Sequence, residues 1–323
     1  MEAVLQTTST LTFSDRWDHI LTRWGYRRGH HRVAPGLYKL GNPDEKSPVF
    51  VTANYTLSFD AVREALAGQD CHLLVLDTHG VNVWCAAGKG TFSTDELVRK
   101  IESSRLKEVV SHRVVILPQL GASGVSAHEV KKRTHFKVEY GPIRAADLPE
   151  YLKTRQATPN MRKVSFTFKE RMVLAPVELV QRFLPFAAAI LALWLLIGPL
   201  AGWAALATLA ACCILFPALL PWLPTRQFSI KGFTLGVLTA LPFIVMALTS
   251  GQPLWQQGIL ALAFLSGIPA VTAYIALNFT GSTPLTGPSE VSREMRRYIR
   301  PMAGLGIISA LCLIASIAIR FVG

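Results

Sequence analysis

The sequence predicts a two-part protein: an α/β domain with a mostly parallel sheet, followed by an all-α membrane domain of five transmembrane helices. Charge is spread unevenly, because residues 183–323 hold only seven of the 33 basic and two of the 21 acidic side chains. Short apolar runs alternate with helical patterns up to residue 157, and long uncharged runs come later. A soluble protein normally has about a quarter of its residues charged. This chain has 17%, which excludes a wholly soluble enzyme.

The expected α/β elements follow one another along residues 1–157. Apolar runs separated by helical patterns are typical of a Rossmann-like sheet with helical crossovers. Strands are expected at Val49–Thr52, Leu73–Leu76, Val114–Leu117 and Phe136–Val138. Helices are expected at Asp15–Trp24, Phe59–Leu66, Asp95–Ser103, Ala127–Arg133 and Ala146–Lys153. Ser58, Thr94 and Ser126 are the expected N-caps of the second, third and fourth helices.

Two amphipathic patterns mark the ends of this domain. The first helix places Trp17, Ile20, Leu21 and Trp24 on one face. Residues 158–181 are a polar linker. Within the linker an alternation at Val164, Phe166 and Phe168 predicts a short strand.

Three long uncharged runs define the membrane domain, expected over residues 182–323. A spanning helix needs about 20 mostly apolar residues. Uncharged runs of 43, 58 and 19 residues begin at Phe183, Gly232 and Pro301, and turn residues divide the first two. The five predicted spans are 183–200, 203–223, 232–249, 254–278 and 302–321. Their central parts lack ionisable residues, which argues against a pump or secondary transporter.

The basic residues predict the orientation of the spans. They precede the first span and occupy the second and fourth connections, whereas the first and third connections carry none, and Arg320 after the fifth span is a minor exception. Positive loops stay cytoplasmic, so we expect the N-terminal domain in the cytoplasm of a bacterial or archaeal cell and the chain in its inner membrane. No apolar leader precedes the first helix, so no cleaved signal peptide is expected. The net charge of +12 indicates contact with anionic membrane lipids rather than with nucleic acid.

Three loops are expected to meet at the carboxyl ends of the strands, where such sheets bind ligands. They are residues 53–56, 77–85 and 118–124, and they offer hydroxyls, amides and glycines suited to a large cofactor with polar edges. Asp77 and His79 resemble the start of the D-x-H-x-x-G cobalamin signature. Asn82 stands where that signature requires glycine, so His79 is expected to be a polar loop residue.

The second loop contains the most specific pattern. Asn82 can cap a short helix, and Cys85 then lies in its first turn, where the positive end of the helix dipole favours a thiolate. The small residues Ala86, Ala87 and Gly88 would let a flat, wide group lie against this helix. From the residues alone, a small buried cysteine beside a packed Trp84 remains an open alternative.

Residues 82–89, Asn-Val-Trp-Cys-Ala-Ala-Gly-Lys, closely resemble the signature of the mercury-methylating corrinoid protein (HgcA) family. The resemblance extends over nearly the whole chain, including the five-span tail. The N-terminal domain is also similar to the corrinoid domain of the corrinoid iron–sulfur protein of the acetyl-CoA pathway. Further segments that carry the resemblance are residues 51–55, 117–122, 140–145, 278–281 and 294–296.

The resemblance implies a corrinoid-binding domain and a methyltransferase activity. Cys85, as a thiolate, would be the catalytic residue and the axial ligand of the corrinoid cobalt. A methyl-tetrahydrofolate-linked donor would supply the methyl group, which methylcobalt(III) would pass to Hg(II), giving methylmercury. A ferredoxin-like iron–sulfur protein would be the reductant. The implied cofactor contacts are Thr52, Asn54, Ser58, Asn82, Val83, Trp84, Ala86, Ala87, Gly88, Lys89 and Gly121.

Two other functions stay open at the level of sequence. One is a membrane-tethered corrinoid methyl carrier of the acetyl-CoA pathway type, with an acceptor other than mercury. The other is a non-enzymatic membrane protein whose soluble domain senses a ligand.

Overall fold

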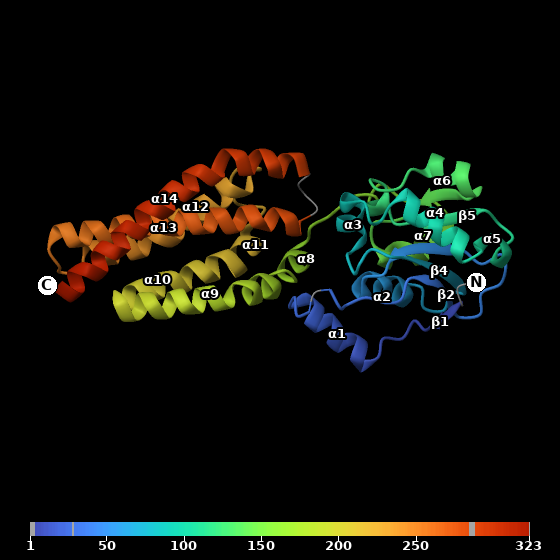
Figure 1. The fold of residues 1–323 in the computed structure, drawn as a ribbon, viewed down its shortest axis with the longest axis horizontal. Helices are drawn as coiled ribbons and strands as arrows, with labels where there is room; N and C mark the ends of the chain where they lie inside the picture. Colours follow the sequence, from blue (N-terminus) through green and yellow to red (C-terminus); the bar gives the residue numbers. More distant parts are fainter. Residues whose placement is uncertain (1–3, 28, 284–287, 323) are drawn as a thin grey trace. The chain divides into compact units, whose positions relative to one another are not determined.

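The computed structural model describes residues 4–27, 29–283 and 288–322, which form two compact units (Figure 1). The first unit ends at Ser165 and the second begins at Phe166. The first is a mixed α/β unit and the second is entirely helical over its described residues.

The α/β unit is built on a six-stranded sheet with the order β1-β2-β4-β3-β5-β6. All neighbouring strands are parallel except β2 and β4, which are antiparallel, so the sheet is mixed rather than uniformly parallel. The four strands expected from the sequence are present, and β1 and β2 are additional. The strands are β1 (Leu5–Thr7), β2 (Gly36–Leu40), β3 (Val49–Ala53), β4 (Cys71–Leu76), β5 (Val114–Leu117) and β6 (Lys137–Tyr140).

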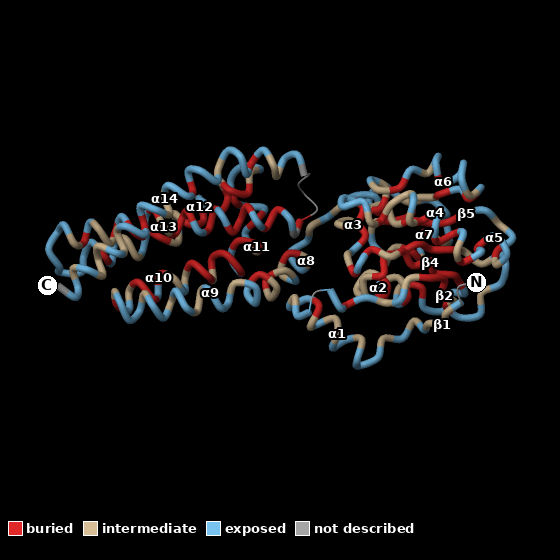
Figure 2. Tube along the Cα trace, viewed as in Figure 1, coloured by how far each residue is buried: buried red, intermediate tan, exposed pale blue. Residues whose placement is uncertain are grey.

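Helices cover both faces of this sheet, which explains why the central strands β3 and β4 are buried along their whole length. Val51 and Leu74 belong to the core beneath α3, α4 and α6, while Phe50 and Leu73 belong to the core beneath α2 and α7. Figure 2 shows the buried residues concentrated along the strands. The helices are α1 (Phe13–Arg23), α2 (Thr56–Ala65), α3 (Val83–Lys89), α4 (Thr94–Ser103), α5 (Leu106–Val109), α6 (Ala127–Thr134) and α7 (Leu148–Thr154).

Two of the three expected helix caps were wrong. Helix α2 begins three residues early, so Ser58 lies inside its first turn and its N–H donates to the Tyr55 carbonyl at 2.9 Å. Helix α4 is capped by Ser93, whose hydroxyl accepts the Glu96 N–H. The Thr94 hydroxyl accepts the Ser126 N–H instead, at 2.8 Å. Ser126 caps α6 as expected.

The loops that follow β3 and β4 are tied together by one buried side chain, Asn54. Its Oδ1 accepts the N–H groups of Thr78 and Gly80, both at 3.0 Å, and the Thr78 hydroxyl lies 2.9 Å away. Its Nδ2 donates to the Asp77 carboxylate at 3.0 Å. All the hydrogen bonds that the Asn54 side-chain oxygen accepts therefore come from the second loop. These bonds fix the path of the chain up to α3.

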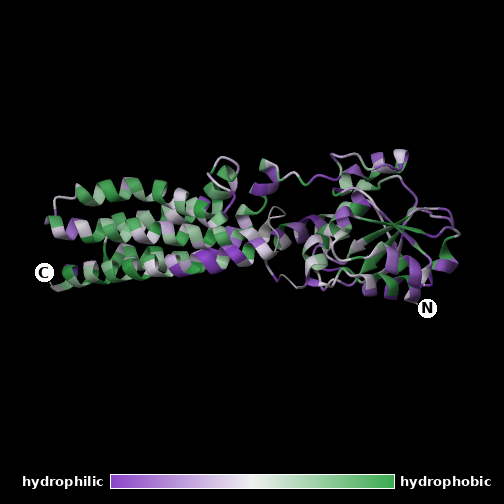
Figure 3. Cartoon of the chain, turned by 90° about the horizontal axis from the view of Figure 1, so that it is seen from above, coloured by the Kyte–Doolittle hydropathy of each residue, from purple (hydrophilic) through white to green (hydrophobic). Residues whose placement is uncertain are grey.

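The second unit contains five helical segments long and apolar enough to cross a membrane, at Phe168–Leu196, Pro199–Leu219, Phe228–Leu248, Leu254–Phe279 and Ser289–Phe321. Hydrophobic residues cover these helices, as Figure 3 shows. Helix α13 packs against α12 and α14, and α9 packs against α10. The elements are α8 (Phe168–Met172), α9 (Ala175–Leu196), α10 (Pro199–Ala210), a π-helical turn η3 (Ala211–Leu215), α11 (Phe216–Leu219), α12 (Phe228–Leu248), α13 (Leu254–Phe279) and α14 (Pro288–Val322).

The structure corrects two expectations for this unit. The short strand expected at Val164–Phe168 is absent among the described residues, and α8 begins there instead with a capping box formed by Thr167 and Glu170. The basic residues expected in the connection before the fifth span, Arg293 to Arg300, lie on α14 itself, because that helix begins at Pro288.

Buried cations stabilise the chain between α11 and α12. The Lys231 ammonium lies at the start of α12 and donates to the Leu220 and Leu223 carbonyls at 2.8 and 2.6 Å. The Arg171 guanidinium donates to the Pro217 carbonyl at 2.8 Å. Carbonyls near the end of a helix have no intrahelical partner, so these two side chains satisfy groups that an apolar surrounding would leave unpaired. Lys231 therefore caps the carbonyls of Leu220 and Leu223, in addition to being a basic residue at the end of a predicted span.

We expect Asn54→Ala to loosen the loop between β4 and α3. The substitution leaves the Thr78 and Gly80 N–H groups without their acceptor, and an unsatisfied buried donor costs about 1–3 kcal/mol. Hydrogen–deuterium exchange should rise in residues 77–82 while strand β4 stays protected. Asn42→Ala, at an exposed asparagine, is the matched control. Unchanged exchange in the Asn54 variant would show that the loop is held by other contacts.

Candidate functional site

The candidate site lies at the carboxyl edge of the parallel strands β3, β4 and β5. The three predicted loops follow these strands, and the structure brings them together. Asn54 joins the first loop to the second through hydrogen bonds. Helix α3, which ends the second loop, packs against β3 and against the 3₁₀ turn η1 (Gln119–Gly121) of the third loop. The convergence predicted from the sequence is therefore present.

Helix α3 presents Cys85 at this edge. Asn82 is its N-cap as predicted, because the Asn82 Oδ1 accepts the Cys85 N–H at 2.9 Å. Gly90 ends the helix in the left-handed conformation with φ +79°. The Cys85 thiol is free and half-buried. Helix α3 thus has seven residues between two defined caps, and Cys85 lies in its first turn.

The two faces of α3 differ from the sequence-based expectation. Val83, Ala86 and Ala87 are buried in the core of the α/β unit, so the alanines pack inward and do not line an open surface. Cys85, Gly88 and Lys89 share the opposite, more open face, because residues three and four apart lie on one side of a helix. A Cβ built on Gly88 would meet no atom within 4 Å. The flat surface beside the thiol is therefore made by Gly88.

Several of the other predicted contact residues are deeply buried or only half-exposed in the structure. Thr52 lies within β3 and is as deeply buried as Asn54. Gly121 is needed for packing, since a Cβ there would lie 2.6 Å from the Phe92 ring. Ser58 and Trp84 are half-buried. The residues that can touch a bound group directly are thus Cys85, Gly88 and Lys89. Thr52, Asn54 and Gly121 are packed beneath them and support this edge of the sheet.

Two polar groups at this edge were not singled out from the sequence, although Gln119 belongs to the third predicted loop. The Glu96 carboxylate on α4 accepts the Asp77 N–H at 2.9 Å and so helps to fix the second loop. The Gln119 side-chain oxygen is buried without a hydrogen-bond partner. Such an atom is a strong candidate to meet a ligand donor, because an unpaired buried acceptor costs free energy. The sequence signal that could have identified Gln119 was its position directly after β5 and Pro118.

Neither His79 at this edge nor Cys71, at the opposite end of β4, is suited to bind a metal. His79 is exposed and has the left-handed φ of +57° within the loop, as expected for a polar loop residue. Cys71 belongs to β4. Burial is the main cause that raises the pKa of the Cys71 thiol to about 12. No three His, Cys, Asp or Glu side chains gather as a metal-binding group in residues 4–27, 29–283 and 288–322.

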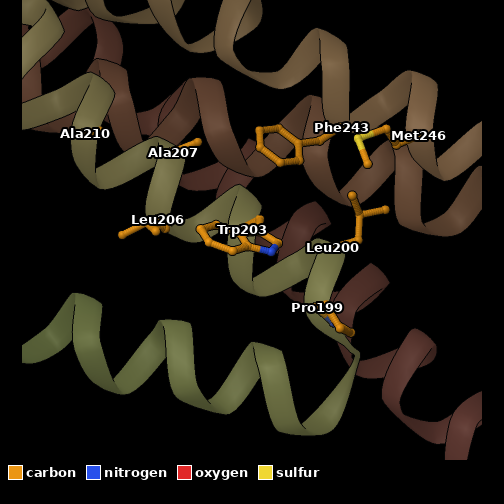
Figure 4. A pocket seen from close by; sticks show the side chains of 8 residues that line it. All are labelled: Pro199, Leu200, Trp203, Leu206, Ala207, Ala210, Phe243 and Met246. Carbon is orange, nitrogen blue, oxygen red and sulfur yellow. The ribbon is translucent and has the colours of Figure 1, made fainter.

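The second unit contains a groove of a different kind. It has a volume of about 540 Å³ and lies between α10 and α12 (Figure 4). Its lining residues are Pro199, Leu200, Trp203, Leu206, Ala207, Ala210, Phe243 and Met246. These side chains offer no group for acid–base or nucleophilic chemistry, so the reaction site is not expected there.

Comparison with known proteins identifies relatives of the α/β unit. A family model described as the CO dehydrogenase/acetyl-CoA synthase delta subunit matches residues 27–152. A gamma subunit of the acetyl-CoA decarbonylase/synthase complex from Methanopyrus kandleri is 38% identical over 128 residues, which are 39% of this chain and 27% of that protein. The Methanocaldococcus jannaschii gamma subunit is 33% identical over 141 residues, or 43% of this chain and 28% of that protein.

These matches define how far the similarity reaches. The chain spans only about a quarter of the length of the relatives it matches. The family match ends before the second unit begins, and it includes Cys85 and all three loops of the candidate site. The predicted relation to proteins of the acetyl-CoA pathway is confirmed for the α/β unit, and the closer resemblance to the mercury-methylating family stays a prediction.

Proposed function

We propose that this chain is a membrane-anchored corrinoid-dependent methyl-transfer protein in which the Cys85 sulfur is the axial ligand of cobalt. One observation carries the proposal: a free, half-buried thiol stands on a doubly capped helix at the ligand-binding edge of the sheet, beside the open face of Gly88. The similarity of residues 27–152 to acetyl-CoA pathway subunits supports the same cofactor class.

The residues at the edge fit such a cofactor. A corrinoid is wide and flat with amide-bearing edges, and its bound cobalt supplies a centre that accepts a methyl group and passes it on. Gly88 leaves room for a flat group beside the thiol, and the unpaired Gln119 oxygen can accept a hydrogen bond from an amide. Asn82 holds the Cys85 N–H and so positions the thiol without touching the metal itself.

Cys85 would also influence the direction of the transfer. A thiolate is a soft, strongly donating ligand. As a ligand of the cobalt in a bound corrinoid, the Cys85 thiolate would favour release of the methyl group with carbanion character. The residue is therefore proposed both as the anchor of the cofactor and as a determinant of which acceptors react.

For the acceptor, the comparisons favour a methyl carrier that serves a protein partner. The reported relatives are gamma subunits of acetyl-CoA decarbonylase/synthase complexes, and their names imply a multi-subunit assembly. In this function the chain would receive a methyl group from a methyl-tetrahydrofolate-linked donor, with a ferredoxin-like iron–sulfur protein as reductant. The five apolar helices would tether the carrier to a membrane.

A second acceptor, Hg(II), is favoured by the segment Asn82–Lys89. That segment carries the resemblance to the mercury-methylating family, and α3 presents it intact at the edge of the sheet. Hg(II) is an electrophile that accepts a carbanion-like methyl group, which is the form that a thiolate ligand is expected to release.

We expect Cys85→Ala to abolish methyl transfer to either acceptor while the protein remains folded and inserted in the membrane. The side chain is only half-buried, so its loss leaves the core intact. Cys85→His is expected to keep some corrinoid but to transfer poorly, because neutral imidazole is a weaker donor. Cys312→Ala, which removes another free thiol, is the control. Full methyl transfer by Cys85→Ala would overturn the assignment.

One assay separates the two acceptors. Anaerobic membranes containing the full chain are incubated with reductant, methyl donor and isotopically labelled Hg(II), and labelled methylmercury is measured. Methylmercury that depends on Cys85 is the result expected for the mercury function. Corrinoid-loaded protein that becomes methylated but forms no methylmercury would contradict it and favour the carrier function.

We further propose that the α/β unit faces the cytoplasm of a bacterial or archaeal cell. The connections Ile197–Gly198 and Thr249–Pro253 carry no charge, whereas the basic residues lie near the opposite helix ends, with Arg320 at the end of α14 as the exception. A Gly251→Cys variant should react with an impermeant maleimide in intact cells, and Ser289→Cys only after permeabilisation. Labelling is compared with the unsubstituted chain, and the reverse pattern would overturn this orientation.

A further inference from the structure

Helix α1 exposes an apolar stripe on the surface of the α/β unit. Phe13, Trp17, Ile20 and Trp24 are 83%, 52%, 38% and 48% exposed, respectively. Their spacing of four, three and four residues places them on one side of a helix with 3.6 residues per turn. Such a spacing of apolar residues ordinarily predicts a buried helix face, but in α1 this face is exposed.

The polar side of α1 is turned toward the protein, where an ion-pair network holds it. The Arg63 guanidinium on α2 donates to Asp60 at 2.6 Å and to Asp15 of α1 at 2.9 Å. His19 of α1 contacts the other oxygen of Asp60 at 2.7 Å. Asp60 and Arg63 are both buried, so this is an internal network and not a solvated surface pair.

A second set of polar contacts fixes the carboxyl half of the helix. The buried His31 ring lies 2.7 Å from the Asp18 carboxylate and also contacts the Tyr26 carbonyl. The Thr22 hydroxyl is buried and donates to the Asp18 carbonyl at 2.7 Å. Breaking a buried, partnered charge is costly. The orientation of α1 is therefore specified by its polar face, and the outward direction of the stripe follows from it.

The network also leaves the outer surface of α1 positively charged. Both acidic side chains of the helix, Asp15 and Asp18, are paired within the unit, with the Arg63 guanidinium and the His31 ring, respectively. The basic side chains Arg16, Arg23 and Arg27 are exposed. The outer surface of α1 thus combines aromatic side chains with arginines. Both acidic residues of α1 face the rest of the unit instead.

We propose that α1 docks on the surface of an anionic bilayer, with its aromatic stripe in the interfacial region and its arginines at the lipid headgroups. Tryptophan is enriched at this depth because its ring is apolar and its N–H remains hydrated. Amphipathic helices with basic residues bind anionic lipid through both effects. A bilayer is also within reach of this chain, because its second unit has five helices of spanning length.

Lipid chemistry, rather than the size of the stripe, favours a bilayer over a second protein. Four side chains of this exposure present roughly 400–500 Å² of apolar surface. A stable protein interface buries about 800 Å² on each partner, of which a little over half is apolar, so the area alone fits either occupant. A bilayer requires no complementary surface, and each arginine adds about 1 kcal/mol near an anionic leaflet. Docking would restrict the motion of the α/β unit on its membrane anchor.

The test uses the full chain in lipid nanodiscs with p-benzoylphenylalanine, a photoreactive residue, in place of Trp17. The matched control carries the same residue in place of Lys132, an exposed position on α6. On illumination in phosphatidylglycerol discs, we expect lipid adducts at position 17 and none at position 132. The adducts at position 17 should be lost in purely phosphatidylcholine discs and in an Arg16→Glu, Arg23→Glu variant.

Three results would overturn the proposal. One is the absence of lipid adducts at position 17 in anionic discs, and another is an equal yield in the two lipids. The third is a crosslink from position 17 to a second copy of the chain, which would assign the stripe to self-association. Retained protection of β4 in hydrogen–deuterium exchange verifies that each variant is folded. The docking rests on the proposed membrane anchoring, but no corrinoid or methyl transfer enters these measurements, so their outcome is independent of the proposed methyl-transfer activity.

Discussion

The side chain of Asn54 is the constraint on which the candidate site depends. It stands at the end of β3 and accepts hydrogen bonds from the chain that follows β4, so two loops far apart in sequence share one buried anchor. The position of α3 follows from that anchor, and the position of Cys85 follows from the N-cap of α3. A chain of ordinary neutral hydrogen bonds thus controls where the Cys85 thiol is presented.

The strongest sequence signals predicted the framework of both units. Continuous apolar runs identified β3, β4 and β5, and uncharged runs identified the five apolar helices. Strands β1 and β2 were missed because β1 has only three residues and β2 pairs with its neighbour in the opposite direction to the others. Asn82 was recognised as a cap because capping is a local interaction that spans only three residues.

Two features of the structure that the sequence could not predict concern which way a side chain faces. In α3 the alanines pack into the core and Gly88 supplies the open surface, and a seven-residue helix is too short for its pattern to decide between the two. In α1 the usual rule is reversed, because buried partners on α2 attract its polar face. Such reversals depend on Asp60 and Arg63, which lie some forty residues away in sequence, so no local pattern could show them.

The most direct test of the central claim is X-ray absorption at the cobalt edge on the full chain purified with its corrinoid. If the Cys85 sulfur is the axial ligand, the spectrum must contain one sulfur neighbour of cobalt, and that neighbour must disappear in Cys85→Ala. A cobalt coordination shell made only of nitrogen and oxygen, or a spectrum unaltered by Cys85→Ala, would contradict the account.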